Sequence, residues 1–207
     1  MEDLGLDPKL VDKSLDFKKV NDNKKKLYAA LDLGTNSCRM LIARPTGSRF
    51  EIVDAFSKSI RLGLDLERTG ELSQAGISRA LQALHVCAKK LNKFGVRNSR
   101  LVATEACRRS KNGKSFLSKV KKETGLTLEL IKPEEEARLA VISCAPLFDP
   151  NFSHVLIVDI GGGSTELVWM DLSEVPKEKR IAEMLKLQLG FKNKNYSKSE
   201  KSKKDHI

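Results

Sequence analysis

The sequence has little of what marks disulfide-bonded or base-stacking proteins. Its 207 residues include only four cysteines, one tryptophan and 5% aromatic residues. The cysteines lie far apart with no paired spacing, which favours free thiols in the cytoplasm over a disulfide framework or a zinc site. The scarcity of aromatic rings leaves little surface for stacking on bases, so we expect no specific nucleic-acid binding.

Long hydrophobic runs are also missing. The most apolar stretch, Leu139–Phe148, is interrupted by Ser143 and Pro146 and is roughly half of the about 20 residues that a membrane helix needs. The chain begins with MEDLGLDPKL, which has acidic residues where an export signal is basic and then apolar. The sequence therefore predicts no contact with a membrane and a cytoplasmic location.

What the chain has in excess is positive charge. With 38 Lys and Arg against 27 Asp and Glu the net charge is +11, yet 40% of the residues are hydrophobic, enough for a sizeable core. The lysine-rich ends have almost nothing to bury. We expect flexible tails at 1–26 and 192–207, a first lobe over 27–147 and the start of a second lobe over 148–191.

The first half of the central region alternates short apolar runs with turns. Leu27–Gly34, Cys38–Arg44 and Phe50–Ile60 predict three strands in a meander. From Ser73, a suitable N-cap, apolar residues recur with three-and-four spacing up to Gly95. That period predicts an amphipathic helix with one buried face.

The second half continues as strand, helix, strand, helix. We expect strands over 100–106 and 126–131, a helix over 114–125 between them, and a helix from Pro133 to about Ala145, because proline and carboxylates favour a helix start. Two strands joined by a triple-glycine turn follow over 154–170, and 184–191 is expected to add one last strand or helix. This alternation indicates an α/β protein.

A strand ending in aspartate, followed by a glycine turn and a second strand, occurs twice, at Asp32 and Asp159. Glycine in such turns lets backbone N–H groups converge on a phosphate oxygen. The aspartates themselves would repel phosphate, so we expect them to hold Mg²⁺. Asp159 stands among Leu156, Ile157, Val158 and Ile160, where a carboxylate is costly to bury without a partner. The predicted phosphate-binding residues of the two loops are Gly34, Thr35, Asn36, Ser37, Gly161, Gly162, Gly163, Ser164 and Thr165.

Four motifs together, DLGTNSCRMLIA, ATEACR, PEEEARLA and VDIGGGSTELV, span about residues 27–175. In this order and spacing they resemble the exopolyphosphatase and guanosine pentaphosphate phosphatase (Ppx/GppA) family. The two loops look like the phosphate loops of the superfamily that includes actin, heat-shock ATPases and sugar kinases. The resemblance implies a ribonuclease-H-like (actin-like ATPase) lobe with a three-stranded meander and a mixed sheet, and a truncated second lobe.

The resemblance also implies an activity, the magnesium-dependent hydrolysis of a terminal phosphate of polyphosphate or guanosine pentaphosphate. By motif, Glu136 falls on the catalytic base and Arg108 on a phosphate-binding arginine. Asp159 and Glu166 fall on the acidic residues that position metal or water, with Asp32 as a further metal ligand. Arg39 falls where many relatives carry arginine, on the strand that leaves the first loop.

Other interpretations of the same residues are possible from the sequence alone. The glutamates after Pro133 could simply cap their helix, with Glu134 and Arg138 as a surface pair worth about 0.3 kcal/mol. The resemblance fades near Glu178, so the chain could be a truncated product, one half of a split enzyme completed by a second chain, or a homodimer. A catalytically impaired protein that binds polyphosphate or nucleotide is therefore the alternative function. A nucleic-acid binder and a superfamily kinase are less well supported.

Overall fold

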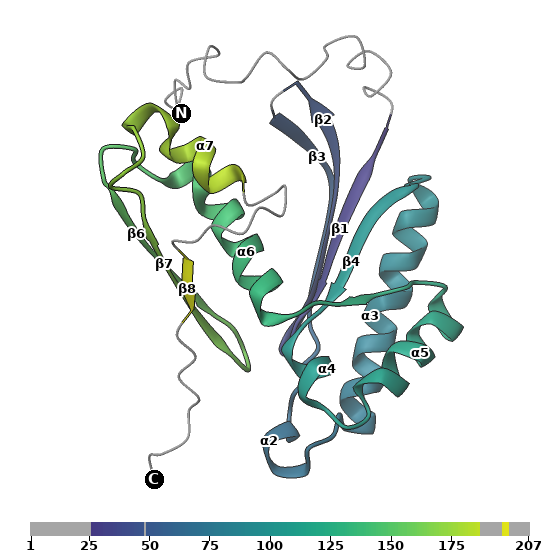
Figure 1. Ribbon diagram of the computed structural model, residues 1–207. Coiled ribbons are helices and arrows are strands. Elements are labelled where there is room, and N and C mark those ends of the chain that lie inside the picture. The colour runs from purple at the N-terminus through teal and green to yellow at the C-terminus, as the bar shows by residue number, and fades with distance from the viewer. Residues whose placement is uncertain (1–25, 48, 187–195, 199–207) are drawn as a thin grey trace.

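The computed structural model describes residues 26–47, 49–186 and 196–198, which form two β-sheets with their helices (Figure 1). The first sheet has the strand order β3-β2-β1-β4-β5. Strands β1 (Tyr28–Leu33), β2 (Ser37–Thr46) and β3 (Arg49–Ser59) pair antiparallel, whereas β4 (Asn98–Ala103) and β5 (Glu129–Leu130) run parallel to β1. This confirms the predicted α/β class, the three-stranded meander and the mixed sheet.

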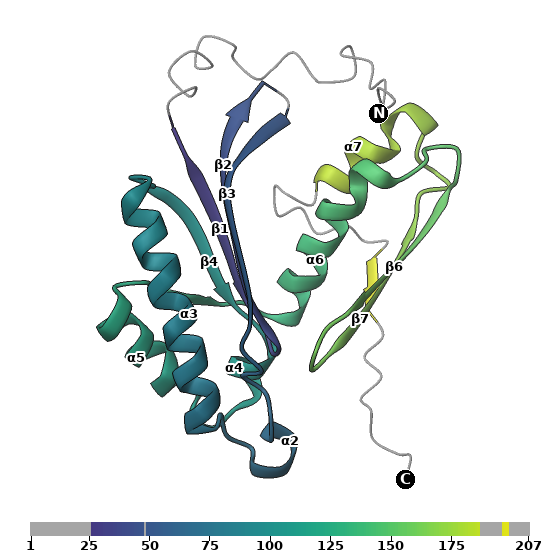
Figure 2. The same ribbon diagram turned by 180° about the vertical axis from the view of Figure 1, so that it is seen from behind.

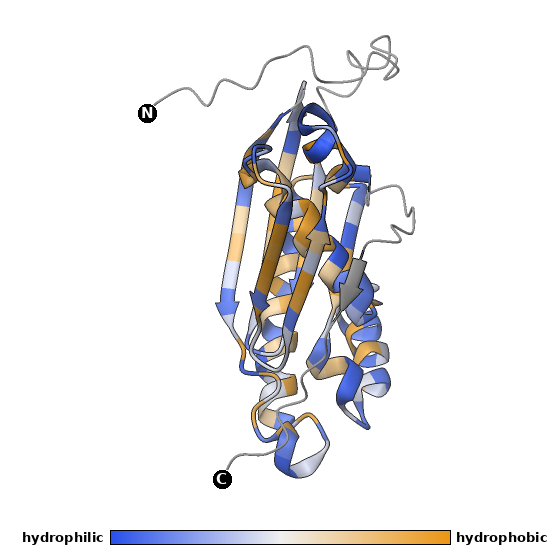
Figure 3. Cartoon of the chain, turned by 60° about the vertical axis from the view of Figure 1, so that its left-hand side comes forward, coloured by the Kyte–Doolittle hydropathy of each residue, from blue (hydrophilic) through white to orange (hydrophobic). Residues whose placement is uncertain are grey.

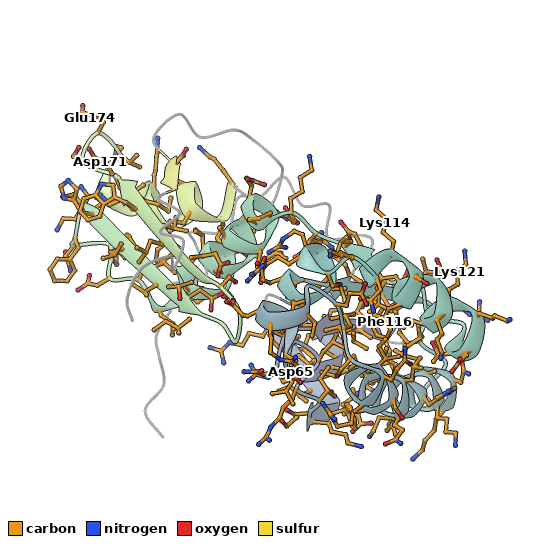
Figure 4. The ribbon with its side chains drawn as sticks, turned by 90° about the horizontal axis from the view of Figure 1, so that it is seen from below. Asp65, Lys114, Phe116, Lys121, Asp171 and Glu174 are labelled. Carbon is orange, nitrogen blue, oxygen red and sulfur yellow. The ribbon has the colours of Figure 1, made fainter. Side chains whose placement is uncertain are left out.

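One face of this sheet is buried under two helices. Ala29, Leu31 and Leu33 alternate along β1 with exposed residues, as expected for a strand with a single covered face. Helices α3 (Gln74–Lys93) and α5 (Gly113–Thr124) lie on the covered side (Figure 2). Figure 4 shows Phe116 of α5 among the side chains of this lobe, whereas Lys114 and Lys121 of the same helix point away.

Helix α3 begins where the sequence predicts. The Ser73 side chain accepts a hydrogen bond from the Gly76 N–H at 3.2 Å, which satisfies one of the free donors of the first turn. The helix turns Ile77, Leu81 and Leu84 into the core. A short helix, α2 (Leu66–Thr69), precedes it.

Two predicted strands are shorter in the structure. The strand expected over 100–106 ends at Ala103, and helix α4 (Glu105–Arg109) takes up the rest of that motif. Of the strand expected over 126–131 only Glu129 and Leu130 pair with β4. Apolar runs of this length do not by themselves distinguish a strand from a buried helix or loop.

The second sheet has the order β6-β7-β8, formed by β6 (His154–Ile160), β7 (Thr165–Asp171) and β8 (Tyr196–Lys198). Strand β8 lies within the range 192–207 that the sequence predicts as a flexible tail. Short 3₁₀ helices at Ala145–Leu147 and Lys177–Lys179 and helix α7 (Arg180–Leu185) complete the lobe. The predicted tail at 1–26 lies outside the described residues except for Lys26, as do residues 187–191.

Helix α6 (Pro133–Cys144) starts at the predicted proline and packs on the second sheet. Its Ala137 and Val141 share a buried cluster with Val168, Met170 and Met184. The last residues of the first cluster are Leu128 and, packed against it, the partly buried Leu130. The core thus changes between Leu130 and Ala137, whereas the domain boundary at 147 stays a prediction.

The second sheet leaves apolar side chains on its other face. Leu156, Val158 and Ile160 of β6 are between 50% and 77% exposed, and Trp169 of β7 is 45% exposed. Figure 3, which brings this side of the molecule forward, shows hydrophobic colour along these strands. No helix in the described ranges is both long and apolar enough to cross a membrane. The four cysteines are free, as the sequence predicts.

Candidate active site

The two aspartate-bearing hairpins close with the same turn. In β1–β2 the Gly34 N–H donates to the Ser37 carbonyl oxygen at 2.9 Å, and in β6–β7 the Gly161 N–H donates to the Ser164 carbonyl oxygen at 2.9 Å. Each aspartate lies two residues before the glycine that opens its turn and faces a charged residue across the strand pair. Asp32 is opposite Arg39, whereas Asp159 is opposite Glu166. The repeat seen in the sequence is thus a repeat of backbone geometry.

The tips of these hairpins meet. A Cβ added at Gly162 would collide with the side-chain nitrogen of Asn36, and one added at Gly163 would lie 2.9 Å from Thr35 Oγ1. Figure 4 shows Asp171 and Glu174 at the far end of the second hairpin, so its glycine turn is the end that points at the first lobe. The bare glycines of one loop therefore make room for the side chains of the other.

Glu136 stands beside these tips on the first turn of α6 and is held by Arg108 of α4. Both terminal nitrogens of Arg108 donate to Glu136 Oε2 at 3.2 Å, and Nη1 also donates to the Ile131 carbonyl oxygen at 2.8 Å. Arg108 Nη2 further donates to Glu105. The family resemblance gives Arg108 a phosphate-binding role, which stays a prediction; in the structure Arg108 lies on helix α4 and its guanidinium contacts the predicted base. These contacts fix the position of the Glu136 carboxylate.

The neighbouring glutamates have other partners. Glu135 forms ion pairs with Arg138 at 2.6 Å and with Arg100 at 2.8 Å. The hydrogen bond from Arg138 lowers the pKa of Glu135 to about 2. Glu134 is exposed. Only Glu136 of the three is turned toward the hairpins, so capping of the helix does not by itself account for its environment.

Negative charge accumulates around Glu136. Partial burial of the Glu136 carboxyl raises its pKa above the usual 4.5, and the nearby Glu166 carboxylate raises it as well, to a smaller extent. Arg108 lowers the same pKa. Burial also raises the pKa of Asp32, Arg39 lowers it and Asp159 raises it. These influences place carboxylates from both lobes near one another.

Glu166 and Asp159 differ in exposure. Glu166 is only 5% exposed, and among the described residues no group donates a hydrogen bond to its carboxylate. An unpaired buried carboxylate is costly and calls for a cation or water. Asp159 is exposed, and so are Leu156, Val158 and Ile160 beside it. The expectation that Asp159 is buried is wrong: it lies on the same face of β6 as the buried Ile157, but next to the last residue of the strand, where it is exposed.

The carboxylate oxygens of this site suit a hard cation such as Mg²⁺, which prefers oxygen ligands and keeps several of its bound waters. Within the described ranges, however, no three His, Cys, Asp or Glu side chains gather closely enough to hold a metal by themselves. Water or substrate oxygens would have to complete the coordination. Magnesium binding by Asp32, Asp159 and Glu166 stays a prediction.

Two charged residues near the site were not predicted as site residues. Glu105 lies inside the motif ATEACR and, from the first turn of α4, contacts the same Arg108 that holds the base. Arg61, in the loop after β3, lines a pocket together with Thr35, Asn36 and Gly162. The motif could have drawn attention to Glu105, whereas no local pattern marks Arg61.

Comparison with known proteins agrees with this arrangement. The model of the Ppx/GppA phosphatase family matches residues 41–192. A crystal structure of the Aquifex aeolicus Ppx/GppA family member is 36% identical over 71% of this chain and 48% of that chain, with a TM-score of 0.61. An exopolyphosphatase-like protein is 30% identical over 74% of this chain and 47% of its own, with a TM-score of 0.66.

An exopolyphosphatase from Cytophaga hutchinsonii is 25% identical over 70% of this chain and 46% of its own, also with a TM-score of 0.66. The chain thus spans about half the length of the solved structures that it resembles. The family model begins within β2, so its match covers the second hairpin and the helices α4 and α6 but not the turn after Asp32.

Proposed function

The chain belongs to the Ppx/GppA phosphatase family, and from this premise we propose that it hydrolyses the terminal phosphate of inorganic polyphosphate or of guanosine pentaphosphate. One observation above all supports the proposal. Two glycine-turn hairpins from different lobes meet tip to tip, and Glu136, held by Arg108, stands beside them. That arrangement combines a place for a phosphoryl group with a carboxylate that can accept a proton from water.

In the proposed reaction the terminal phosphate lies between the two loops, bound by their backbone N–H groups and by Thr35, Asn36 and Thr165. Glu136 orients a water molecule and takes its proton as the oxygen attacks phosphorus. The phosphoanhydride bond breaks, and the shortened chain leaves with the bridging oxygen. The raised pKa of Glu136 makes it a stronger proton acceptor than an ordinary glutamate.

The remaining charged residues serve this step. Asp32, Asp159 and Glu166 would hold magnesium, which supplies positive charge to the phosphate oxygens when bound. Arg39, opposite Asp32, would offer its guanidinium to the phosphate. Arg108 positions Glu136 through the contacts already described, and Glu105 in turn orients Arg108.

The test is phosphate release from polyphosphate and from guanosine pentaphosphate by the full chain with magnesium. Glu136→Gln should lower kcat by about 10²- to 10⁴-fold, the usual contribution of a general base. Glu134→Gln, on the same helical turn but exposed, is the matched control and should keep full activity. The relative rates on the two substrates would show which one is preferred.

Two results would contradict the proposal in different ways. Equal activity of wild type and Glu136→Gln would remove Glu136 as the base. Salt-sensitive binding of polyphosphate without any release of phosphate would instead favour the alternative, a binding protein that does not catalyse hydrolysis.

A further inference from the structure

A pocket of about 460 Å³ lies beside the meeting hairpins, within the size range of ligand sites. It is formed by the hairpin tips, through Thr35, Asn36 and Gly162, and by the loop that follows β3, through Arg61, Leu64 and Asp65. Glu136 is not among the residues that line it. The pocket therefore shares the predicted phosphate loops but extends away from the predicted base.

The loop after β3 is fastened to the first phosphate loop. The backbone N–H groups of Ile60 and Arg61 donate to the Asn36 carbonyl oxygen at 2.8 and 3.0 Å, and the Gly63 N–H donates to the Thr35 carbonyl oxygen at 3.0 Å. On the other side, Arg79 of α3 donates to the carbonyl oxygens of Ile60 at 2.7 Å and Arg61 at 3.1 Å. Any ligand of the hairpin tip would meet this loop in a fixed position.

Arg61 adopts an unfavourable backbone conformation at this place. Its φ is +46° and that of Asp65 is +68°, and within the described ranges no other non-glycine residue has a positive φ. Such conformations cost of order 1–3 kcal/mol and persist where the surroundings enforce them, often at ligand sites. Both strained residues line the same pocket.

The charge of Arg61 is not neutralised by the protein. Among the described residues no side chain forms an ion pair or hydrogen bond with its guanidinium, whereas Asp65 lies 3.7 Å from Arg68. The pocket thus contains an arginine available for an anion and an aspartate whose charge is already opposed. A guanidinium has five N–H donors that suit phosphate oxygens.

We infer that this pocket binds the phosphate groups next to the terminal one in a polyphosphate chain and that Arg61 is the side chain that contacts them. The inference rests on the proposed function, because the terminal phosphate is taken to occupy the shared hairpin tips. A chain extending from those tips passes Asn36 and Gly162 and reaches Arg61 within the same cavity. Orthophosphate would fill the tips alone and leave Arg61 without a contact.

Binding and turnover are measured separately. Titration calorimetry measures the affinity for tripolyphosphate and for orthophosphate of two proteins: the Glu136→Gln variant, and the double variant that also carries Arg61→Gln. Loss of a charged hydrogen bond should weaken tripolyphosphate binding about tenfold, with orthophosphate binding unchanged. Arg61→Lys should restore part of the affinity, because it keeps the charge without the planar fork.

The matched control is Arg97→Gln, which removes the same charge from an exposed residue just before β4, at the end of the sheet away from Asp32. It should leave tripolyphosphate binding within about twofold, since distant exposed charges are screened by salt. In the active protein, Arg61→Gln should raise KM for polyphosphate about tenfold and leave kcat nearly unchanged, as expected when ground state and transition state lose the same contact.

The inference is overturned if Arg61→Gln binds tripolyphosphate as tightly as Arg97→Gln, or if it weakens orthophosphate equally. Thermal unfolding of both variants separates a binding effect from misfolding. If the wild type releases no phosphate, the proposed function fails, but the calorimetric comparison still decides the role of Arg61.

Discussion

The first hairpin, β1–β2, and the second, β6–β7, share a turn and an aspartate but differ in what surrounds them. Asp32 lies opposite Arg39 on a strand that pairs on both sides, with β2 and with β4. Asp159 lies opposite Glu166, and in the described part of the chain its strand pairs only with β7. Both aspartates are exposed, but the first faces a basic residue on an interior strand, whereas the second faces the buried acid Glu166 on a strand at the sheet edge.

The loops differ in a complementary way. The first has Thr35 and Asn36 at the positions where the second has Gly162 and Gly163, and the side chains of one occupy the space left by the other. The first loop thus supplies polar side chains, and the second supplies backbone N–H groups and the space that those side chains fill. Two identical loops with side chains could not approach each other so closely.

The largest expected difference between the two hairpins is in the stability lost when an apolar side chain of the strand is shortened. Leu31 of β1 is 2% exposed, whereas Leu156 of β6 is 57% exposed. Leu31→Ala should cost about 2–5 kcal/mol of unfolding free energy because it opens a cavity in the core. Leu156→Ala should cost less than about 0.5 kcal/mol. Urea unfolding measures both, and a comparable loss at Leu156 would mean that the outer face of β6 is covered in solution.

A smaller effect concerns the contact of the tips. Gly162→Ala forces Asn36 to move, since the added methyl group would meet its side-chain nitrogen. A flexible side chain can move without unfolding the protein, so we expect kcat/KM to fall about tenfold with little change in thermal stability, in keeping with misplaced phosphate donors. Asn36→Gly removes a proposed phosphate donor but also the clash, so the double variant should lose less than the sum of the two single losses in a double-mutant cycle. Additive effects of the two changes would show that the tips do not contact each other.

The smallest effect is electrostatic and compares the acids of the two hairpins. Glu166 raises the pKa of Glu136 more than Asp32 does. Glu166→Gln should therefore lower the pKa of Glu136 further than Asp32→Asn, and Arg108→Gln should raise it, because Arg108 favours the ionised form. Carboxyl ¹³C NMR titration without magnesium measures each shift. If Glu166→Gln and Asp32→Asn lowered the pKa of Glu136 by the same amount, the two hairpins would not differ in their electrostatic effect on the base.

The same raised pKa gives a stability change with a definite sign. Protonated Glu136 is favoured in the folded state, so its contribution to stability is complete below pH 4.5 and is lost as the pH rises through its higher folded pKa. Asp32, whose pKa is also raised, acts in the same direction. Both groups therefore oppose folding at neutral pH, as expected for carboxylates gathered to bind a cation.

Much of the fold could be predicted because local patterns agree with it. Ser73 as N-cap, Pro133 as helix start and the triple glycine as turn all lie where the sequence places them. The end of β4 could not be predicted, because residues 104–106 read equally well as strand or helix. Nor could the exposure of Asp159 be predicted, because it shares a face of β6 with the buried Ile157 and an apolar run does not reveal how far along the strand that face is covered.

Some features of the site could likewise be predicted from the sequence, whereas others could not. The motifs identify Asp32, Glu136 and the glycine loops, but not that Arg108 and Glu136, 28 residues apart, contact each other. Nor do they identify Arg61, because a positive φ at an arginine results from the hydrogen bonds of Asn36 and Arg79 around it rather than from its own preference.

By itself the sequence determined the alternation of strands and helices, the repeated aspartate–glycine turns and the family, because hydrophobic period, capping and turn residues act within a few positions of the chain. Only the tertiary structure decided which face of each strand is covered, that the two glycine loops meet, and which of three adjacent glutamates faces them. Those properties depend on contacts between residues distant along the chain, and packing selects them only once both lobes have formed.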